Sequence, residues 1–75
     1  LLKGTRSPGR DKTLLFCIAA GLDLHETDRA LRSAGEPVLY SRKRRDAIII
    51  FAINEHLNVS DTQELLEQFG ERILE

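Results

Sequence analysis

The chain has 75 residues, of which 41% are hydrophobic and 31% charged, and its formal net charge is −1. This length supports one small domain, and the composition is typical of a globular protein rather than a disordered one. No apolar run approaches the roughly 18 residues of a membrane span, and no signal-peptide pattern is present. The single cysteine cannot form an internal disulfide. We therefore expect a cytoplasmic protein without a membrane partner.

An internal repeat organises the sequence. A shift of 35 residues aligns residues 10–39 with residues 45–74 without a gap, and ten of the 30 pairs are identical. The identical pairs include Arg10/Arg45, Asp11/Asp46 and Phe16/Phe51. Composition alone would give roughly two matches, so the sequence contains two copies of one structural unit.

The first copy is expected to contain two helices. The first covers Asp11–Ala20, because its Leu and Ala residues favour a helix, Asp11 suits an N-cap and Gly21 suits a stop. The second covers Glu26–Ala34 and ends before Gly35. Its core-facing stripe has helical spacing and consists of Thr27, Ala30, Leu31 and Ala34.

The second copy should repeat this pattern. Its apolar run from Ala47 to Ile53 could by itself be a buried strand, but the Leu- and Ala-rich first copy favours a helix, which we place over Arg45–His56. A fourth helix is expected over Asp61–Phe69, with Ser60 and Gln63 as a capping box. Its stripe consists of Thr62, Leu65, Leu66 and Phe69. The two hairpins should close on each other as an all-α, compact four-helix unit.

We expect the core to lie between the two hairpins. Ile50 and Phe51 should be largely buried, and Phe51→Ala should cost about 3–5 kcal/mol, as large-to-small core substitutions do. Small side chains of the first copy should interlock with larger ones of the second. The small ones are Cys17, Ala20, Ala30 and Ala34, and the larger ones are Leu65 and Phe69.

Two segments of different character are expected along the chain. Residues 1–9 are basic and include the turn signal Ser7–Pro8–Gly9, so they should link the domain to an upstream part of a longer protein. The absence of Met from the chain agrees with such an upstream part. Residues 10–75 should form a single four-helix domain.

No catalytic or metal-binding pattern stands out. Cys17 lies in an apolar run without the partners of a nucleophile, so we expect a buried core cysteine. His25 and His56 have no Cys, His or Asp neighbours at metal-ligand spacing, and His56 suits a helix C-terminus. We expect a protein that is not an enzyme and needs no cofactor or metal.

Charge is unevenly distributed along the chain. Residues 1–45 carry ten Lys or Arg and five Asp or Glu, whereas residues 46–75 carry one and seven. Such a polarity allows head-to-tail association or contact with a polyanion, and it also describes ordinary solvated faces. The candidates for contact with DNA phosphates or a partner are Arg6, Arg10, Arg42, Lys43, Arg44 and Arg45. The candidates for an acidic partner face are Glu64, Glu67 and Glu71.

Two stretches carry a resemblance to a known family. Residues 4–12 resemble the turn and helix start that follow the recognition helix in phage-repressor-like (XRE-type) helix-turn-helix domains. Residues 22–27, with Leu31 and Gly35, resemble the end of that domain, and residues 45–74 look like a repeat that follows it in some bacterial regulators. The resemblance implies a bacterial regulator of transcription, with this chain as its structural and interaction module. The helix-turn-helix itself would lie upstream, and His25 replaces that family's usual capping residue.

A second resemblance remains open. A small helical bundle with opposite charges on its halves is also similar to death-fold adaptor modules, which assemble by like-with-like contacts. Both resemblances imply a protein partner or self-association. DNA contact would come through the parent protein, with the basic residues contacting only the phosphate backbone.

Overall fold

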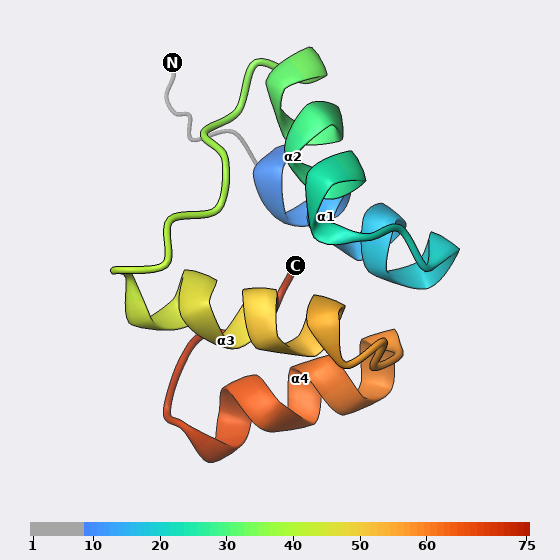
Figure 1. The fold of residues 1–75 in the computed structure, drawn as a ribbon. Helices are drawn as coiled ribbons and strands as arrows, with labels where there is room; N and C mark the ends of the chain where they lie inside the picture. The colour runs from blue at the N-terminus through green and yellow to red at the C-terminus, as the bar shows by residue number, and fades with distance from the viewer. Residues whose placement is uncertain (1–8) are drawn as a thin grey trace.

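The computed structural model describes residues 9–75, which contain four α-helices and no strand. They are α1 (Gly9–Ala20), α2 (Leu24–Ser33), α3 (Arg44–Asn54) and α4 (Val59–Gln68). Figure 1 shows α1 and α2 as one hairpin and α3 and α4 as a second. The predicted all-α fold of two helical hairpins is confirmed, including a helix at Ile48–Ile53. The predicted basic turn, except Gly9, and the candidate Arg6 lie outside the described residues.

The helix starts differ from the predicted ones. Asp11 lies inside the first turn of α1 rather than at its N-cap. The N-cap of α2 is Asp23, which forms a capping box with Glu26. The N-cap of α4 is its repeat equivalent Asn58, whose side chain accepts a 2.7 Å hydrogen bond from the Asp61 N–H. The predicted capping box of Ser60 and Gln63 is therefore wrong, because Ser60 already lies within α4.

The helix ends also correspond between the two copies. Gly35 and Gly70 follow α2 and α4 with positive φ, a conformation that costs glycine little. After α1 the same conformation is adopted by Gly21, and after α3 by its equivalent His56, with φ 57°. The predicted third helix was therefore too long, because His56 leaves the helical conformation two residues after Asn54.

The core lies where the two hairpins meet. The extended segments after α2 and after α4 each add one buried leucine, at equivalent positions. The buried cluster consists of Leu14, Ile18, Leu31, Leu39, Ile48, Ile49, Ile53, Leu66 and Leu74. Besides pairing within each hairpin, α1 packs on α4 and α2 packs on α3. The first helix of each hairpin thus packs on the second helix of the other hairpin, which is the arrangement that an approximate two-fold axis relating the two copies produces.

Two expectations about the core are wrong. Phe51 is 52% exposed and Ile50 is only half-buried, because the helix turns the neighbours Ile49, Ala52 and Ile53 inward instead. The loss of about 3–5 kcal/mol expected for Phe51→Ala requires a buried ring, so it does not apply to this half-exposed side chain. The predicted interlocking also fails, since Ala20, Ala34 and Phe69 are exposed and only Cys17 of the small set is fully buried.

No helix within residues 9–75 combines the length and the apolar character that a membrane crossing requires.

Candidate functional site

The most buried carboxylate belongs to Asp46, which receives a bidentate ion pair from the other hairpin. Arg10 Nη1 donates to Asp46 Oδ1 at 3.2 Å, and Arg10 Nη2 donates to Oδ2 at 2.9 Å. The Tyr40 N–H donates to the same Oδ2 at 3.0 Å. Arg10 also donates to the carbonyl oxygens of Pro37 and Val38, at 3.0 and 3.1 Å. One guanidinium thus joins α1, α3 and the segment between the hairpins.

The second copy repeats this arrangement with the roles exchanged. Arg45 donates to Asp11 Oδ1 and Oδ2 at 3.2 and 3.0 Å. It also donates to the carbonyl oxygens of Arg72 and Ile73, at 2.8 and 2.9 Å. The Glu75 N–H completes the set by donating to Asp11 Oδ2 at 3.2 Å. The three backbone partners, Arg72, Ile73 and Glu75, lie 35 residues after Pro37, Val38 and Tyr40 of the first set, and Asp11 lies 35 residues before its equivalent Asp46.

The reciprocal network occupies two of the candidate arginines. Charge-assisted, bidentate Arg–Asp pairs are among the stronger hydrogen-bonded contacts, and both pairs are largely shielded from solvent. Arg10 and Arg45 therefore hold the hairpins together, and their contact with a phosphate or an external partner stays a prediction. Their side-chain nitrogens are committed to internal acceptors.

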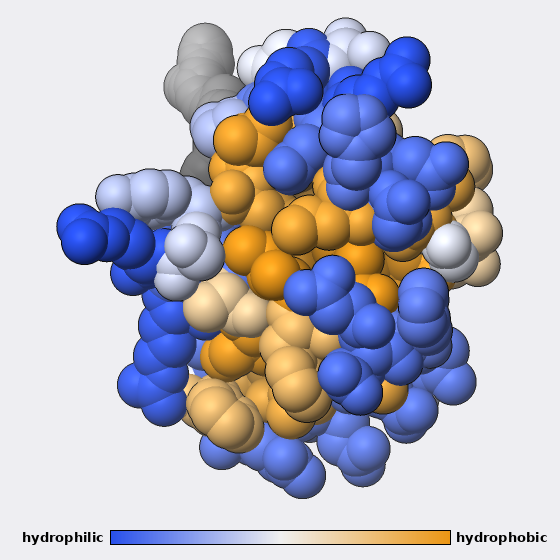
Figure 2. All heavy atoms as spheres, viewed as in Figure 1, coloured by the Kyte–Doolittle hydropathy of each residue, from blue (hydrophilic) through white to orange (hydrophobic). Residues whose placement is uncertain are grey.

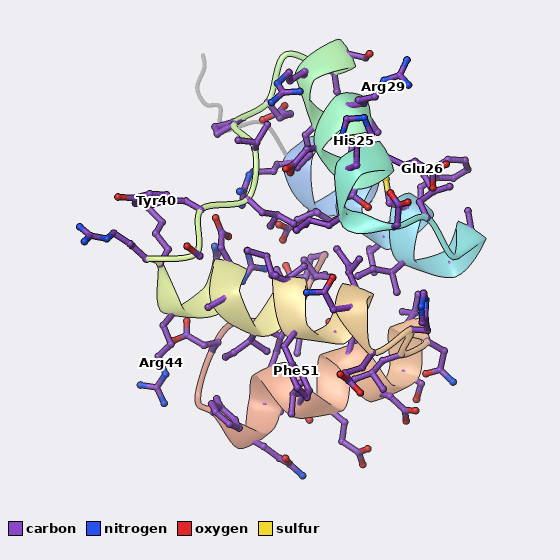
Figure 3. All side chains as sticks on the ribbon, in the orientation of Figure 1. His25, Glu26, Arg29, Tyr40, Arg44 and Phe51 are labelled. Atoms are coloured by element: carbon purple, nitrogen blue, oxygen red, sulfur yellow. The ribbon has the colours of Figure 1, made fainter. Side chains whose placement is uncertain are left out.

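The remaining basic candidates split into two groups. Arg42 and Lys43 are exposed and make no ion pair within the described chain. Arg44 leans toward α4, where its Nε lies 3.6 Å from Glu71 Oε2 and its guanidinium lies 5.9 Å from the centre of the Phe69 ring. Figure 3 shows Arg44 at the start of α3, well away from the labelled residues of α2.

The acidic candidates are likewise divided. Glu64 and Glu67 are exposed on α4 and make no ion pair within residues 9–75. Glu71 is partly buried and pairs with Arg44 of its own chain. The basic candidate Arg44 and the acidic candidate Glu71 therefore pair inside the molecule, and of the acidic candidates Glu64 and Glu67 remain without an ion pair in the described range.

An apolar groove lies between α3 and α4 and was not expected from the sequence. It has a volume of about 520 Å³ and is lined by Arg44, Ala47, Ile48, Phe51, Leu65 and Phe69. Phe51 and Phe69 are both about half-exposed there. Figure 2 shows apolar side chains reaching the surface in this lower part of the molecule, and Figure 3 shows Phe51 between the two helices. We call this feature the α3–α4 groove.

A signal for the groove was present in the helical spacing. On α3 the core takes Ile48, Ile49, Ala52 and Ile53. That set leaves Ala47 and Phe51, four residues apart, on another face. On α4 the residues Leu65 and Phe69 have the same spacing and stand beside the buried Thr62 and Leu66. Each helix therefore has more apolar surface than the core can cover.

The remaining candidates form no reactive centre. Burial raises the pKa of the Cys17 thiol, while its contact with the Thr27 hydroxyl lowers it by less. That hydroxyl is buried and makes no well-oriented hydrogen bond to any described residue. His25 and His56 are exposed on separate hairpins, and the described residues contain no cluster of His, Cys, Asp and Glu that could hold a metal.

Comparison of the chain with family models, with curated proteins and with solved structures gives no match.

Proposed function

We propose that the chain is a non-catalytic protein-interaction module and that the α3–α4 groove is its docking surface. The observation that carries this proposal is the pair of half-exposed aromatic rings, Phe51 and Phe69, around an apolar groove. Aromatic side chains in such positions are the usual anchors of protein interfaces. A groove between two helices suits the apolar face of another helix.

The setting that we propose is a bacterial, cytoplasmic regulator of transcription. It rests on the resemblance of residues 4–74 to the region that follows the recognition helix in phage-repressor-like regulators. In that setting the parent protein contacts DNA, and this module brings a second protein chain to it.

The arrangement of basic residues argues against direct DNA recognition by the module itself. Arg10 and Arg45 are bound to internal carboxylates, and Arg44 pairs with Glu71. Arg42 and Lys43 can still approach phosphates, but two such contacts give weak, salt-sensitive and sequence-independent affinity.

Site-specific photo-crosslinking in the cells of origin tests the proposal. A benzoylphenylalanine at position 69 should give a protein adduct, because the reactive ring would lie against the docked partner. The same probe at position 40 is the matched control, since Tyr40 is an equally exposed aromatic outside the groove. Phe51→Asp should abolish the adduct from position 69.

Three results would overturn the proposal. They are an adduct with DNA at position 69, no adduct there, and a protein adduct that persists in the Phe51→Asp variant. An adduct with any protein that requires the intact groove supports it, whether the partner is a second copy or another chain.

A homotypic adaptor is the second candidate function. The observation that favours it is Phe16, the most exposed of the large apolar side chains in the described part of the chain. It occupies the position on α1 that Phe51 occupies on α3.

A further inference from the structure

The lining of the α3–α4 groove is not shared by the two copies of the repeat. Of its six lining positions, only that of Phe51 keeps the same residue in the first copy, as Phe16. The other five positions of the first copy hold small or polar residues, namely Gly9, Lys12, Thr13, Ala30 and Ala34. In the second copy they hold Arg44, Ala47, Ile48, Leu65 and Phe69. The hairpin fold therefore does not require the groove-lining residues, since the first copy forms its hairpin without them.

Arg44 is the one charged residue among the six that line the groove. Its guanidinium lies 5.9 Å from the centre of the Phe69 ring, and its Nε lies 3.6 Å from Glu71 Oε2. That separation is longer than a hydrogen bond, and the Nη atoms donate to no acceptor within residues 9–75. The side chain is 66% exposed. Arg44 thus keeps its paired donors for a carboxylate that enters the groove.

The exposed acidic candidates of α4 do not face a molecule in the groove. Successive residues of a helix are rotated by roughly 100°, and Glu67 lies two residues from both Leu65 and Phe69, so it points to the far side of α4. Glu64 precedes Leu65 by one residue and is turned away by about the same 100°. The charge that an occupant meets in the lining is therefore the positive charge of Arg44.

The walls of the groove favour a helical occupant. The lining residues belong to α3, to α4 and to the C-cap of α4, and the backbone groups within these helices are bonded internally. An extended peptide in the groove would place its own backbone N–H and C=O groups against apolar side chains, where they find no partners. A helix satisfies its backbone internally and presents only side chains to the groove.

We propose that the α3–α4 groove binds an amphipathic helix of another protein, which packs apolar side chains against Phe51 and Phe69 and places an acidic side chain against Arg44. This inference rests on the proposed function and states the chemistry of its partner. A carboxylate and a guanidinium pair through two parallel hydrogen bonds, so the acidic residue fixes the register of the helix. An anionic lipid surface suits this hairpin poorly, because residues 46–75 carry one Lys or Arg and seven Asp or Glu.

Selection from a displayed peptide library tests the partner chemistry. The library consists of alanine-based peptides of about 15 residues, the length at which isolated helices become stable, with apolar and charged positions randomised. Binders to the 75-residue chain are retained after depletion on the Phe51→Asp chain. The enriched peptides should carry large apolar residues at three- and four-residue spacing, with Asp or Glu one turn beyond them. Selection against Arg44→Glu should enrich Lys or Arg at that position instead.

Fluorescence anisotropy of one selected peptide then measures the contact with Arg44. Replacing the acidic residue of the peptide by Gln should weaken binding to the wild type about two- to fivefold, as for an exposed ion pair, and should leave binding to Arg44→Gln unchanged. Arg29→Gln is the matched control, because Figure 3 shows Arg29 on the other hairpin. Phe16→Asp is the control for Phe51→Asp, since Phe16 is its repeat equivalent outside the groove. Circular dichroism confirms that each variant remains helical.

Several results would overturn the inference. They are a selection without enriched peptides, enriched peptides that show no preference for an acidic residue, groove-dependent binding to phosphatidylglycerol vesicles, and self-association of the chain that Phe51→Asp abolishes. The crosslinking experiment separates the two proposals. A groove-dependent protein adduct together with peptides that lack the acidic preference keeps the proposed function and excludes only the acidic helix, whereas the absence of an adduct at position 69 removes both.

Discussion

At the scale of single residues, the two halves of the chain share an Arg–Asp dipeptide. The arginine of each dipeptide pairs with the aspartate of the other. Arginine suits the position because one guanidinium pairs with a carboxylate through two nitrogens and still reaches two carbonyl oxygens. A lysine ammonium lacks that planar fork. Burial disfavours the charged form of Asp11, but the hydrogen bonds from Arg45 and the Glu75 N–H outweigh it and hold the pKa of Asp11 below 3.8.

This lowered pKa predicts a loss of stability in acid. The Asp11 carboxylate stabilises the folded state above pH 3.8, and this contribution should decline as the pH falls from there through the lower pKa of the folded state. Asp11→Asn should therefore be less stable than the wild type at neutral pH, with a difference that shrinks in acid. Urea unfolding at several pH values measures this.

Glu64→Gln serves as the control for the acid experiment, because this carboxylate is exposed and makes no ion pair within the described chain. A difference between Asp11→Asn and the wild type that stayed constant below pH 3.8 would contradict the assignment.

At the scale of the helices, each long apolar run serves two surfaces. One face of α3 fills the core, and the adjacent face, with Ala47 and Phe51, lines the groove. On α4 the core side chain is Leu66, which is fully buried, while Phe69 remains about half-exposed. Position around the helix axis, rather than hydrophobicity, therefore decides what an apolar residue contributes to stability.

Substitutions on the two faces should differ in cost. Leu66→Ala should lower the free energy of unfolding by about 2–5 kcal/mol, because it opens a cavity in the core. Phe51→Ala should cost less than about 1.5 kcal/mol, since the ring is half-exposed and its transfer term is correspondingly smaller. Thermal and urea unfolding of both variants measure the difference, and equal costs would show that Phe51 supports the core.

The sequence predicted helix type and order well but orientation poorly. The repeat identified all four helices, because a matching pattern in the first copy resolved the ambiguous run at Ile48–Ile53. The run from Ala47 to Ile53 has no polar interruption, so nothing in it marks which residues turn inward. The N-cap of α4 is Asn58 rather than the predicted Ser60, and Asn58 occupies the same repeat position as the cap Asp23. Contacts between the copies, such as Arg10 with Asp46, depend on tertiary packing and carry no local signal.

At the scale of the whole molecule, the structure separates internal from external interactions. The reciprocal arginines, the buried aliphatic cluster and the two extended segments join the hairpins to each other. The groove, the Phe16 ring and the unpaired charges of α2 and α4 face outward. A basic cluster that looks continuous in the sequence is thereby divided, and only Arg42 and Lys43 remain open to solvent without an ion pair in the described range.

The reciprocal network also bears on chain connectivity. Each half contributes one guanidinium and one carboxylate to the other, so the two halves are joined by side-chain contacts as well as by the peptide between Ser41 and Arg42. We expect fragment complementation: peptides 1–41 and 42–75, each poorly helical alone, should regain helicity when mixed. Asp46→Asn in the second peptide should weaken this recovery by about 3 kcal/mol, the order expected when one partner of a buried pair is removed. Circular dichroism titration measures this recovery of helicity, and an absence of added helicity in the mixture would show that covalent continuity is essential.

If the hairpins can pair without a covalent link, two intact chains have a route to a domain-swapped dimer. In such a dimer each hairpin pairs with the complementary hairpin of the neighbouring chain.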